Sequence, residues 1–152
     1  MRKVSAGILL YRHGDRGLEV LLAHPGGPFW SKKDLGAWTI PKGEVNEGEE
    51  LLAAAYREFR EEMGTSVEGP LLALGELRQR SGKLVHAWGI LSDFDPTQLK
   101  SALFEMEWPR GSRKLHSFPE VDRAQWFDIA EARRRILPSQ AEFLERLLQA
   151  VR

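Results

Sequence analysis

Short apolar runs alternate with turn-forming residues along the chain, and this pattern predicts a protein that mixes strands with helices. Runs of about four to eight residues that are rich in leucine and β-branched residues, bounded by glycine, proline or aspartate, are typical of strands. The turn-like segment 13–17 separates the first two runs, so these two are expected to form a hairpin. The expected strands cover residues 4–11, 18–23, 38–40, 71–77, 84–91 and 124–127.

Helical spacing of apolar residues is found in three further segments, at about residues 48–63, 129–136 and 139–151. Asn46 followed by Glu49 has the form of a capping box, and Gly64 offers a stop to the first of these helices. The last helix is amphipathic, and its apolar face is expected to point inward. That face consists of Phe143, Leu144, Leu147 and Leu148.

Two long segments lack a regular pattern. Residues 24–36 carry several glycines and prolines around the aromatic pair Phe29 and Trp30, which predicts a long loop. Residues 93–119 are also interrupted by prolines and are predicted to be mostly loop, with one strand near Phe104. The mixture of strands and helices indicates an α/β fold, a mixed β-sheet with helices on both faces.

Length and composition limit the function classes. A chain of 152 residues can bury one core but has no room for a second full domain, so residues 1–152 are interpreted as a single domain. Lysine plus arginine and aspartate plus glutamate both number 22, so no net field attracts a membrane, and no stable nucleic-acid binding is expected. The absence of cysteine fits a reducing compartment, and the first apolar run is too short for a signal sequence, which together predict a cytoplasmic protein. The oligomeric state is not readable from this pattern.

Three carboxylates on the first predicted helix carry the candidate chemistry. Glu61 and Glu62 follow Glu58 at i+3 and i+4, so all three lie on one flank of the helix. Like charges at this spacing cost a few tenths of a kcal/mol per pair, which a bound cation would offset. Hard ions such as Mg²⁺ or Mn²⁺ prefer carboxylate oxygens, and no cysteine or histidine pair favours Zn²⁺. The alternative is an ordinary solvated face with arginine partners.

The wider spacing resembles a known signature. From Gly43 onward the chain reads GEVNEGEELLAAAYREFREEMGT, which is similar to the Nudix box of hydrolases that act on nucleoside diphosphates linked to another moiety. Thr65 departs from the aliphatic residue that usually closes this box. The resemblance implies the Nudix-type α/β/α sandwich over nearly the whole chain. It also implies metal-dependent cleavage of a diphosphate linkage by water, with Mg²⁺ or Mn²⁺ as the cofactor.

The resemblance also suggests a role for individual residues. Glu58, Glu61, Glu62 and the Gly43 carbonyl fall on metal-binding positions, whereas Glu49, Arg57 and Gly64 fall on positions that shape and orient the site. A distant loop often supplies a base or a further ligand, for which Glu120 is the candidate, with Asp122, Glu105 and Glu107 as lesser alternatives. Candidates for phosphate contacts are Lys42, Arg78 and Arg80, and candidates for stacking on a base, or for ordinary packing, are Trp30, Trp88 and Trp108.

The substrate is less well defined than the reaction. The proline that marks ADP-ribose hydrolases is replaced by Arg80, and the tyrosine of some dinucleoside polyphosphate hydrolases is missing from residues 81–83. The segment 38–43 resembles one that is common among polyphosphate-acting members, so nucleoside triphosphates or dinucleoside polyphosphates are favoured. Two alternatives stay open: a non-catalytic nucleotide-binding module on the same fold, and a structural domain whose glutamates have no ligand.

Overall fold

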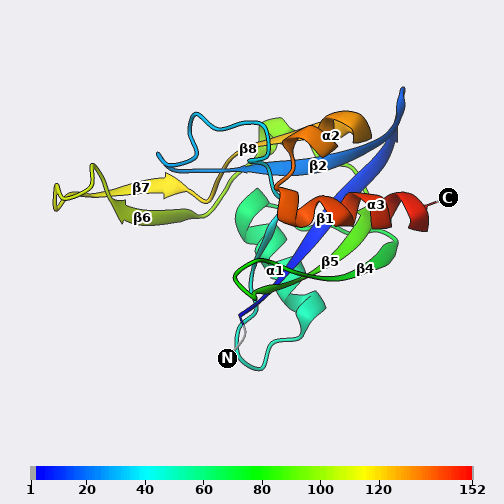
Figure 1. Cartoon of the computed structure of the whole chain (residues 1–152), viewed down its shortest axis with the longest axis horizontal. Coiled ribbons are helices and arrows are strands. Elements are labelled where there is room, and N and C mark those ends of the chain that lie inside the picture. Colours follow the sequence, from blue (N-terminus) through cyan, green and yellow to red (C-terminus); the bar gives the residue numbers. More distant parts are fainter. Residues whose placement is uncertain (1–2, 152) are drawn as a thin grey trace.

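A twisted mixed sheet divides the molecule into two helical layers, and a separate two-stranded hairpin stands out from one end (Figure 1). The computed structural model describes residues 3–151. The order in the main sheet is β4-β5-β1-β2-β8, with β3 paired to β1. The strands are β1 (Val4–Gly14), β2 (Gly17–Pro25), β3 (Lys42–Glu44), β4 (Leu71–Arg78), β5 (Leu84–Leu91), β6 (Leu103–Glu107), β7 (Leu115–Pro119) and β8 (Val121–Asp128).

The central strand β1 shows how the sheet acquires two buried faces. It pairs antiparallel with β2 and β3 and parallel with β5, so it has neighbours on both sides. Because successive side chains of a strand point to opposite faces, Ile8 and Leu10 join one core while Leu9 and Tyr11 join the other. The predicted mixed sheet with helices on both faces is confirmed by this arrangement.

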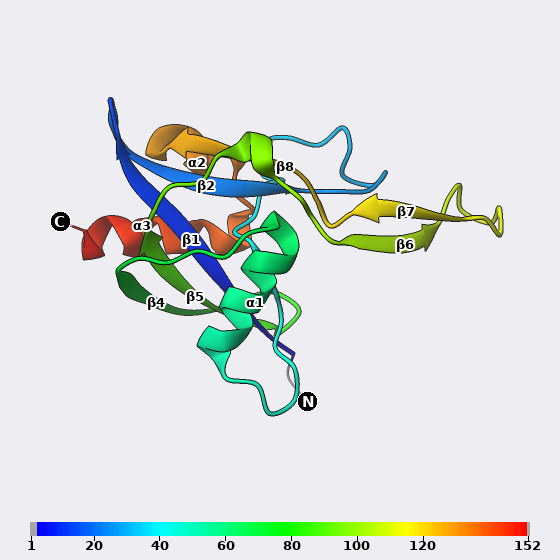
Figure 2. The same cartoon turned by 180° about the vertical axis from the view of Figure 1, so that it is seen from behind.

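The helices lie on opposite sides of the sheet. Helix α1 (Leu51–Met63) covers one face, seen in front in Figure 2, and buries Ala54, Ala55, Phe59 and Met63 there. Helices α2 (Ile129–Arg135) and α3 (Ala141–Ala150) cover the other face, seen in front in Figure 1. Of the predicted inward face of α3, Phe143, Leu144 and Leu147 are buried, whereas Leu148 is half-buried.

Helix α1 begins three residues later than the sequence predicts. Gly48 has a φ of 76°, which no helical residue adopts, and the first helical residue is Leu51. Glu49 does accept a hydrogen bond from the Asn46 N–H, as the capping box requires, but its carboxylate also binds Arg57. Gly64 ends the helix in the left-handed conformation, as predicted.

Three other expectations are wrong in detail. Residues 38–40 form isolated bridges to Ala23 and Ile136 rather than a strand, because each neighbour is contacted at one residue only. The segment 93–119 contains the short 3₁₀ helix η1 (Pro96–Gln98) and two strands, β6 and β7, where one strand near Phe104 was expected. Residues 138–140 form a further 3₁₀ turn, η2 (Pro138–Gln140), so the last helix starts at Ala141.

Within residues 3–151, no helix is both long enough and apolar enough to cross a membrane.

Candidate active site

A close approach between β3 and α1 defines the centre of the candidate site. Gly43 pairs with Ala6 of β1 and faces helix α1, where the carboxylate of Glu58 occupies the space that a side chain at position 43 would need. A Cβ at this position would overlap the Glu58 carboxyl group. Glycine therefore allows the backbone of β3 to reach the glutamate flank of the helix without displacing the Glu58 carboxylate.

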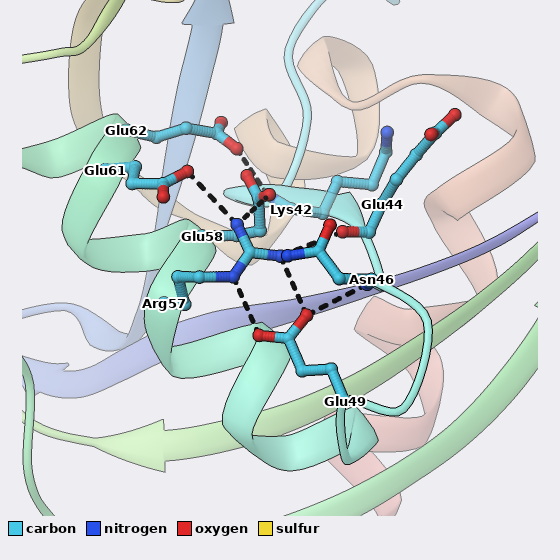
Figure 3. A network of polar contacts seen from close by, with 8 residues as sticks. All are labelled: Lys42, Glu44, Asn46, Glu49, Arg57, Glu58, Glu61 and Glu62. Carbon is cyan, nitrogen blue, oxygen red and sulfur yellow. Dashed lines mark hydrogen bonds and ion pairs between the residues drawn. The ribbon is translucent and has the colours of Figure 1, made fainter.

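Arg57 lies at the centre of the polar network (Figure 3). Its Nε and Nη2 donate to the two carboxylate oxygens of Glu49 at 2.8 and 2.9 Å, and its Nη1 donates to Glu58 at 2.8 Å and to Glu61 at 3.2 Å. Nη2 also donates to the Glu44 carbonyl at 3.0 Å, which ties α1 to β3. One guanidinium group therefore serves three carboxylates, those of Glu49, Glu58 and Glu61.

Glu62 is the deepest of the helix carboxylates. It accepts a hydrogen bond from the Lys42 N–H at 3.1 Å, and burial raises its pKa well above the ordinary value, with further increases from the charges of Glu58 and Glu120. Burial also raises the pKa of Glu58, which the Arg57 contact partly offsets. Holding these carboxylates together therefore costs folding free energy. Carboxylates with raised pKa values are typical of functional sites.

Glu120 reaches the same place from the far end of the chain. It joins β7 to β8, its N–H donates to the Ala102 carbonyl at 2.8 Å, and its carbonyl accepts from the Gly26 N–H at 3.0 Å. The Ala102 N–H donates in turn to the carbonyl of Glu61 at 2.8 Å. Glu120 lies close enough to raise the pKa of both Glu58 and Glu62, so the structure brings this predicted residue to the glutamate flank.

The candidate phosphate contacts divide into two groups. Lys42 adjoins Glu58 and Glu62, and burial together with the charge of Lys83 lowers the pKa of its ammonium group. Arg78 and Arg80 instead line a hollow with Pro138 and Ser139 at η2. Among the described residues, none of the glutamates lines that hollow.

The tryptophans considered for base stacking and the acidic alternatives to Glu120 lie in different parts of the fold. Trp88 packs against the core under α1, whereas Trp108 is exposed at the outer end of β6. Trp30 stands edge-on to Phe29 in the long loop. Glu105 and Glu107 belong to β6, where Glu107 accepts a hydrogen bond from the Gly111 N–H, and Asp122 binds the buried His24.

A metal ion requires a rearrangement of these side chains. Within residues 3–151, no three carboxylate or imidazole groups converge as a ready cluster, because Arg57 holds Glu58 and Glu61 and the Lys42 N–H holds Glu62. The donor set nevertheless fits a hard cation, because it consists of carboxylates and burial raises the pKa of two of them, Glu58 and Glu62.

Comparison with known proteins decides the family. The NUDIX domain model matches residues 1–147. The chain belongs to the Nudix family. A curated relative, Nudix hydrolase 10 of Arabidopsis thaliana, is 58% identical over 33 residues, which are 22% of this chain and only 12% of the plant protein. The predicted resemblance is thereby confirmed.

Solved structures show the same Nudix fold. The Caenorhabditis elegans Ap4A hydrolase binary complex has a TM-score of 0.67 and 22% identity, and the match covers 97% of each chain. The NUDIX domain of Shewanella oneidensis NrtR, complexed with ADP ribose, also has a TM-score of 0.67, at 16% identity over 100% of this chain and 90% of that one. At these identities the likeness establishes the fold class, which confirms the α/β/α sandwich.

Within this Nudix domain, replacing Glu49 by glutamine is expected to weaken the fold in a pH-dependent way. The Arg57 hydrogen bonds, aided by the Asn46 N–H, lower the pKa of Glu49 from its ordinary value of 4.5 to about 2. Because the folded-state pKa is depressed, the stabilisation is present above about pH 4.5 and is lost as the pH falls toward 2. Urea unfolding of both proteins across pH 2 to 7 should show a difference that shrinks within this window. A constant difference would contradict the assignment.

Proposed function

We propose that this Nudix protein is a metal-dependent hydrolase that cleaves a diphosphate linkage in a nucleotide substrate, with nucleoside triphosphates or dinucleoside polyphosphates as the favoured class. The observation that carries the proposal is the close approach of the Glu58 carboxylate to the Gly43 backbone, with Glu62 and Glu120 near enough that burial and mutual repulsion raise the pKa of Glu58 and Glu62. The likeness to an Ap4A hydrolase supports the substrate class.

Mg²⁺ or Mn²⁺ would be held by Glu58, Glu61, Glu62 and Glu120 together with the Gly43 carbonyl. When bound, such an ion lowers the pKa of a water molecule and neutralises charge on the phosphoryl group. The side chains of the protein would position the ion and the substrate. Arg57 would keep Glu58 and Glu61 on one flank of the helix, since both carboxylates share its Nη1.

Two further residues would act on the substrate. Glu62 would accept the proton of the attacking water, because burial raises its pKa and a carboxylate with a raised pKa is a better base than an ordinary one. Glu120 is the alternative base, since it approaches the same carboxylates from the β7–β8 connection. Water attacks one phosphorus atom, the bond from that phosphorus to the bridging oxygen breaks, and the remaining phosphate leaves. Lys42 would meet the charge of the phosphates as a point cation beside this reaction.

A non-catalytic nucleotide-binding module is the second candidate. It is favoured by the likeness to the NrtR NUDIX domain, which was solved in complex with ADP ribose. The candidate site argues against it, since a protein that only binds nucleotides gains nothing from burying carboxylates that repel each other. One experiment distinguishes the two functions. Nucleotide should raise the Tm of a binding module without any product being released, whereas a hydrolase releases a product.

A turnover panel tests the proposal. Purified protein with Mg²⁺ or Mn²⁺ should release phosphate, diphosphate or a nucleotide from at least one member of a panel of nucleoside triphosphates, dinucleoside polyphosphates, nucleotide sugars, ADP-ribose, diphosphoinositol phosphates and 5′-triphosphorylated RNA. Chelation with EDTA should abolish the release, and added Mg²⁺ should restore it. Binding of nucleotide without turnover at any metal concentration would support the module instead. The product identifies the attacked phosphorus.

A further inference from the structure

A fully buried histidine lies at the end of β2, outside the glutamate network. His24 has no exposed surface, and its ring stands edge-on to the buried Trp38 with 5.1 Å between the ring centroids. Its Nδ1 is 2.8 Å from Oδ1 of Asp122, and its Nε2 is 2.6 Å from the carbonyl oxygen of Lys33. Burying a histidine has a cost unless both ring nitrogens are satisfied, and here both are.

The Lys33 carbonyl fixes the direction of one of the two bonds of His24. A carbonyl oxygen never donates, so Nε2 carries the hydrogen of that bond, while one proton lies between Nδ1 and the Asp122 carboxyl group in the other. Asp122 has a second basic neighbour, Arg123 at 3.6 Å, but the Arg123 side chain is half exposed.

The two partners of His24 belong to two different segments, and each of these segments leads to Glu120. Asp122 lies two residues after Glu120, at the start of β8. Lys33 lies in the long loop after β2, whose Gly26 N–H binds the Glu120 carbonyl at 3.0 Å. A side chain at Gly26 would overlap the carbonyl of Pro119, so loop and Glu120 segment are in direct backbone contact. Both project from the same end of the sheet (Figures 1 and 2).

We propose that His24 is a positioning residue that holds the Glu120 carboxylate at the metal site by fixing Asp122. The proposal rests on the proposed function, in which Glu120 is a ligand. The backbone bonds of Glu120 to Ala102 and Gly26 fix its main chain, and the His24–Asp122 pair adds a side-chain restraint two residues later, at the start of β8. Partners that orient metal ligands in this way typically change metal affinity or activity by about 10- to 100-fold when they are lost.

Replacing His24 by asparagine or by glutamine tests its two hydrogen bonds one at a time, because each amide can retain only one of them. The amide nitrogen of asparagine takes the place of Nδ1 and can donate to Asp122, whereas that of glutamine takes the place of Nε2 and can donate to the Lys33 carbonyl. We expect His24→Asn to keep most of the Mn²⁺ affinity and kcat of the wild type. His24→Gln should weaken Mn²⁺ binding by about tenfold and lower kcat by about 10- to 100-fold, with little change in KM.

The measurements are Mn²⁺ titration followed by electron paramagnetic resonance without substrate, and kcat and KM on the best substrate of the panel, both well below each variant's Tm. Arg123→Ala, which removes the exposed partner of Asp122, is the matched control and should leave both readouts unchanged. In a Glu120→Gln background, His24→Gln should have little further effect on Mn²⁺ binding, because both changes disturb the same ligand.

The outcomes distinguish this inference from the proposed function. Equal losses in His24→Asn and His24→Gln, or losses that simply follow Tm, would overturn the positioning role while the hydrolase stands. An additive effect of His24→Gln in the Glu120→Gln background would overturn it as well. A wild-type protein that binds no Mn²⁺ and turns over no member of the panel overturns the proposed function, and the positioning role with it.

Discussion

Replacing Glu62 by glutamine is expected to stop turnover and, at the same time, to make the metal-free protein more stable. The loss of turnover should be roughly a hundredfold to ten-thousandfold, the usual range when a positioned acid or base is removed. The gain in stability follows from burial, because the wild-type protein must keep a carboxylate out of water beside Glu58 and Glu120. Removing such a group should stabilise the fold by about 1 to 3 kcal/mol, which raises Tm by at least about 2 °C.

The pH dependence of this gain has a definite sign. Burial raises the pKa of Glu62 well above its ordinary value of 4.5, so at intermediate pH the folded chain binds more protons than the unfolded chain. The free energy of unfolding of the metal-free protein therefore falls as the pH rises from about 4.5 toward the raised pKa. Glutamine has no such transition, so the advantage of Glu62→Gln should be larger at pH 8 than at pH 5.

Urea unfolding in EDTA, together with turnover in Mg²⁺, measures both effects. Glu61→Gln is the matched comparison, since Glu61 is exposed on the same helix and should lose turnover without gaining stability. A Glu62→Gln protein that keeps wild-type turnover would sink the proposed role of the residue. A variant that is less stable than the wild type would show that the Lys42 N–H contact outweighs the cost of burial.

Replacing Gly43 by alanine is expected to lower turnover by about a hundredfold while the chain still folds. The added Cβ overlaps the Glu58 carboxylate, so either β3 moves away from α1 or Glu58 leaves its place. A displacement of about 1 Å at a reacting centre costs roughly a hundredfold in rate. The fold should lose only about 1 to 3 kcal/mol, as is usual for overpacking at one position.

The control for this change is the next residue of the same strand. Glu44→Ala alters an exposed side chain on β3 and leaves the backbone carbonyl that Arg57 binds, so turnover should stay near the wild-type value. Circular dichroism and Tm establish that both proteins fold. Full turnover in Gly43→Ala would mean that Glu58 moves without consequence, which is incompatible with a metal ligand at that position.

Sequence pattern predicted five strands of the main sheet, all except β3, and the three helices. The apolar run of β1 reflects burial on both of its faces, and the apolar stripe of α1 reflects burial on one. The hairpin of β6 and β7 was predicted only in part, since its strands stand outside the main sheet and leave Leu103 and Leu115 exposed. Without a buried face, a strand carries no reliable pattern.

For the candidate site, local spacing predicted which residues share the helix flank, but not how they interact. The i+4 contact of Arg57 with Glu61 follows from helix geometry, whereas the bonds of Arg57 to Glu49 and the Glu44 carbonyl depend on the turn before the helix. His24 was missed because its partners are 98 and 9 residues away and one of them is a main-chain carbonyl. A single polar residue at the end of an apolar strand was the only available signal.

The segment 100–102 links parts of the chain that are far apart in sequence. Its N–H groups bind the carbonyls of Met63 and Glu61 at the end of α1, and its Ala102 carbonyl binds Glu120, which in turn binds Gly26. Every one of these bonds is between main-chain atoms, so no amino-acid substitution removes a donor or acceptor except a change to proline. Such a scaffold tolerates wide divergence in side chains, which is consistent with a shared architecture at 22% identity and with strong identity to a plant relative over only 33 residues.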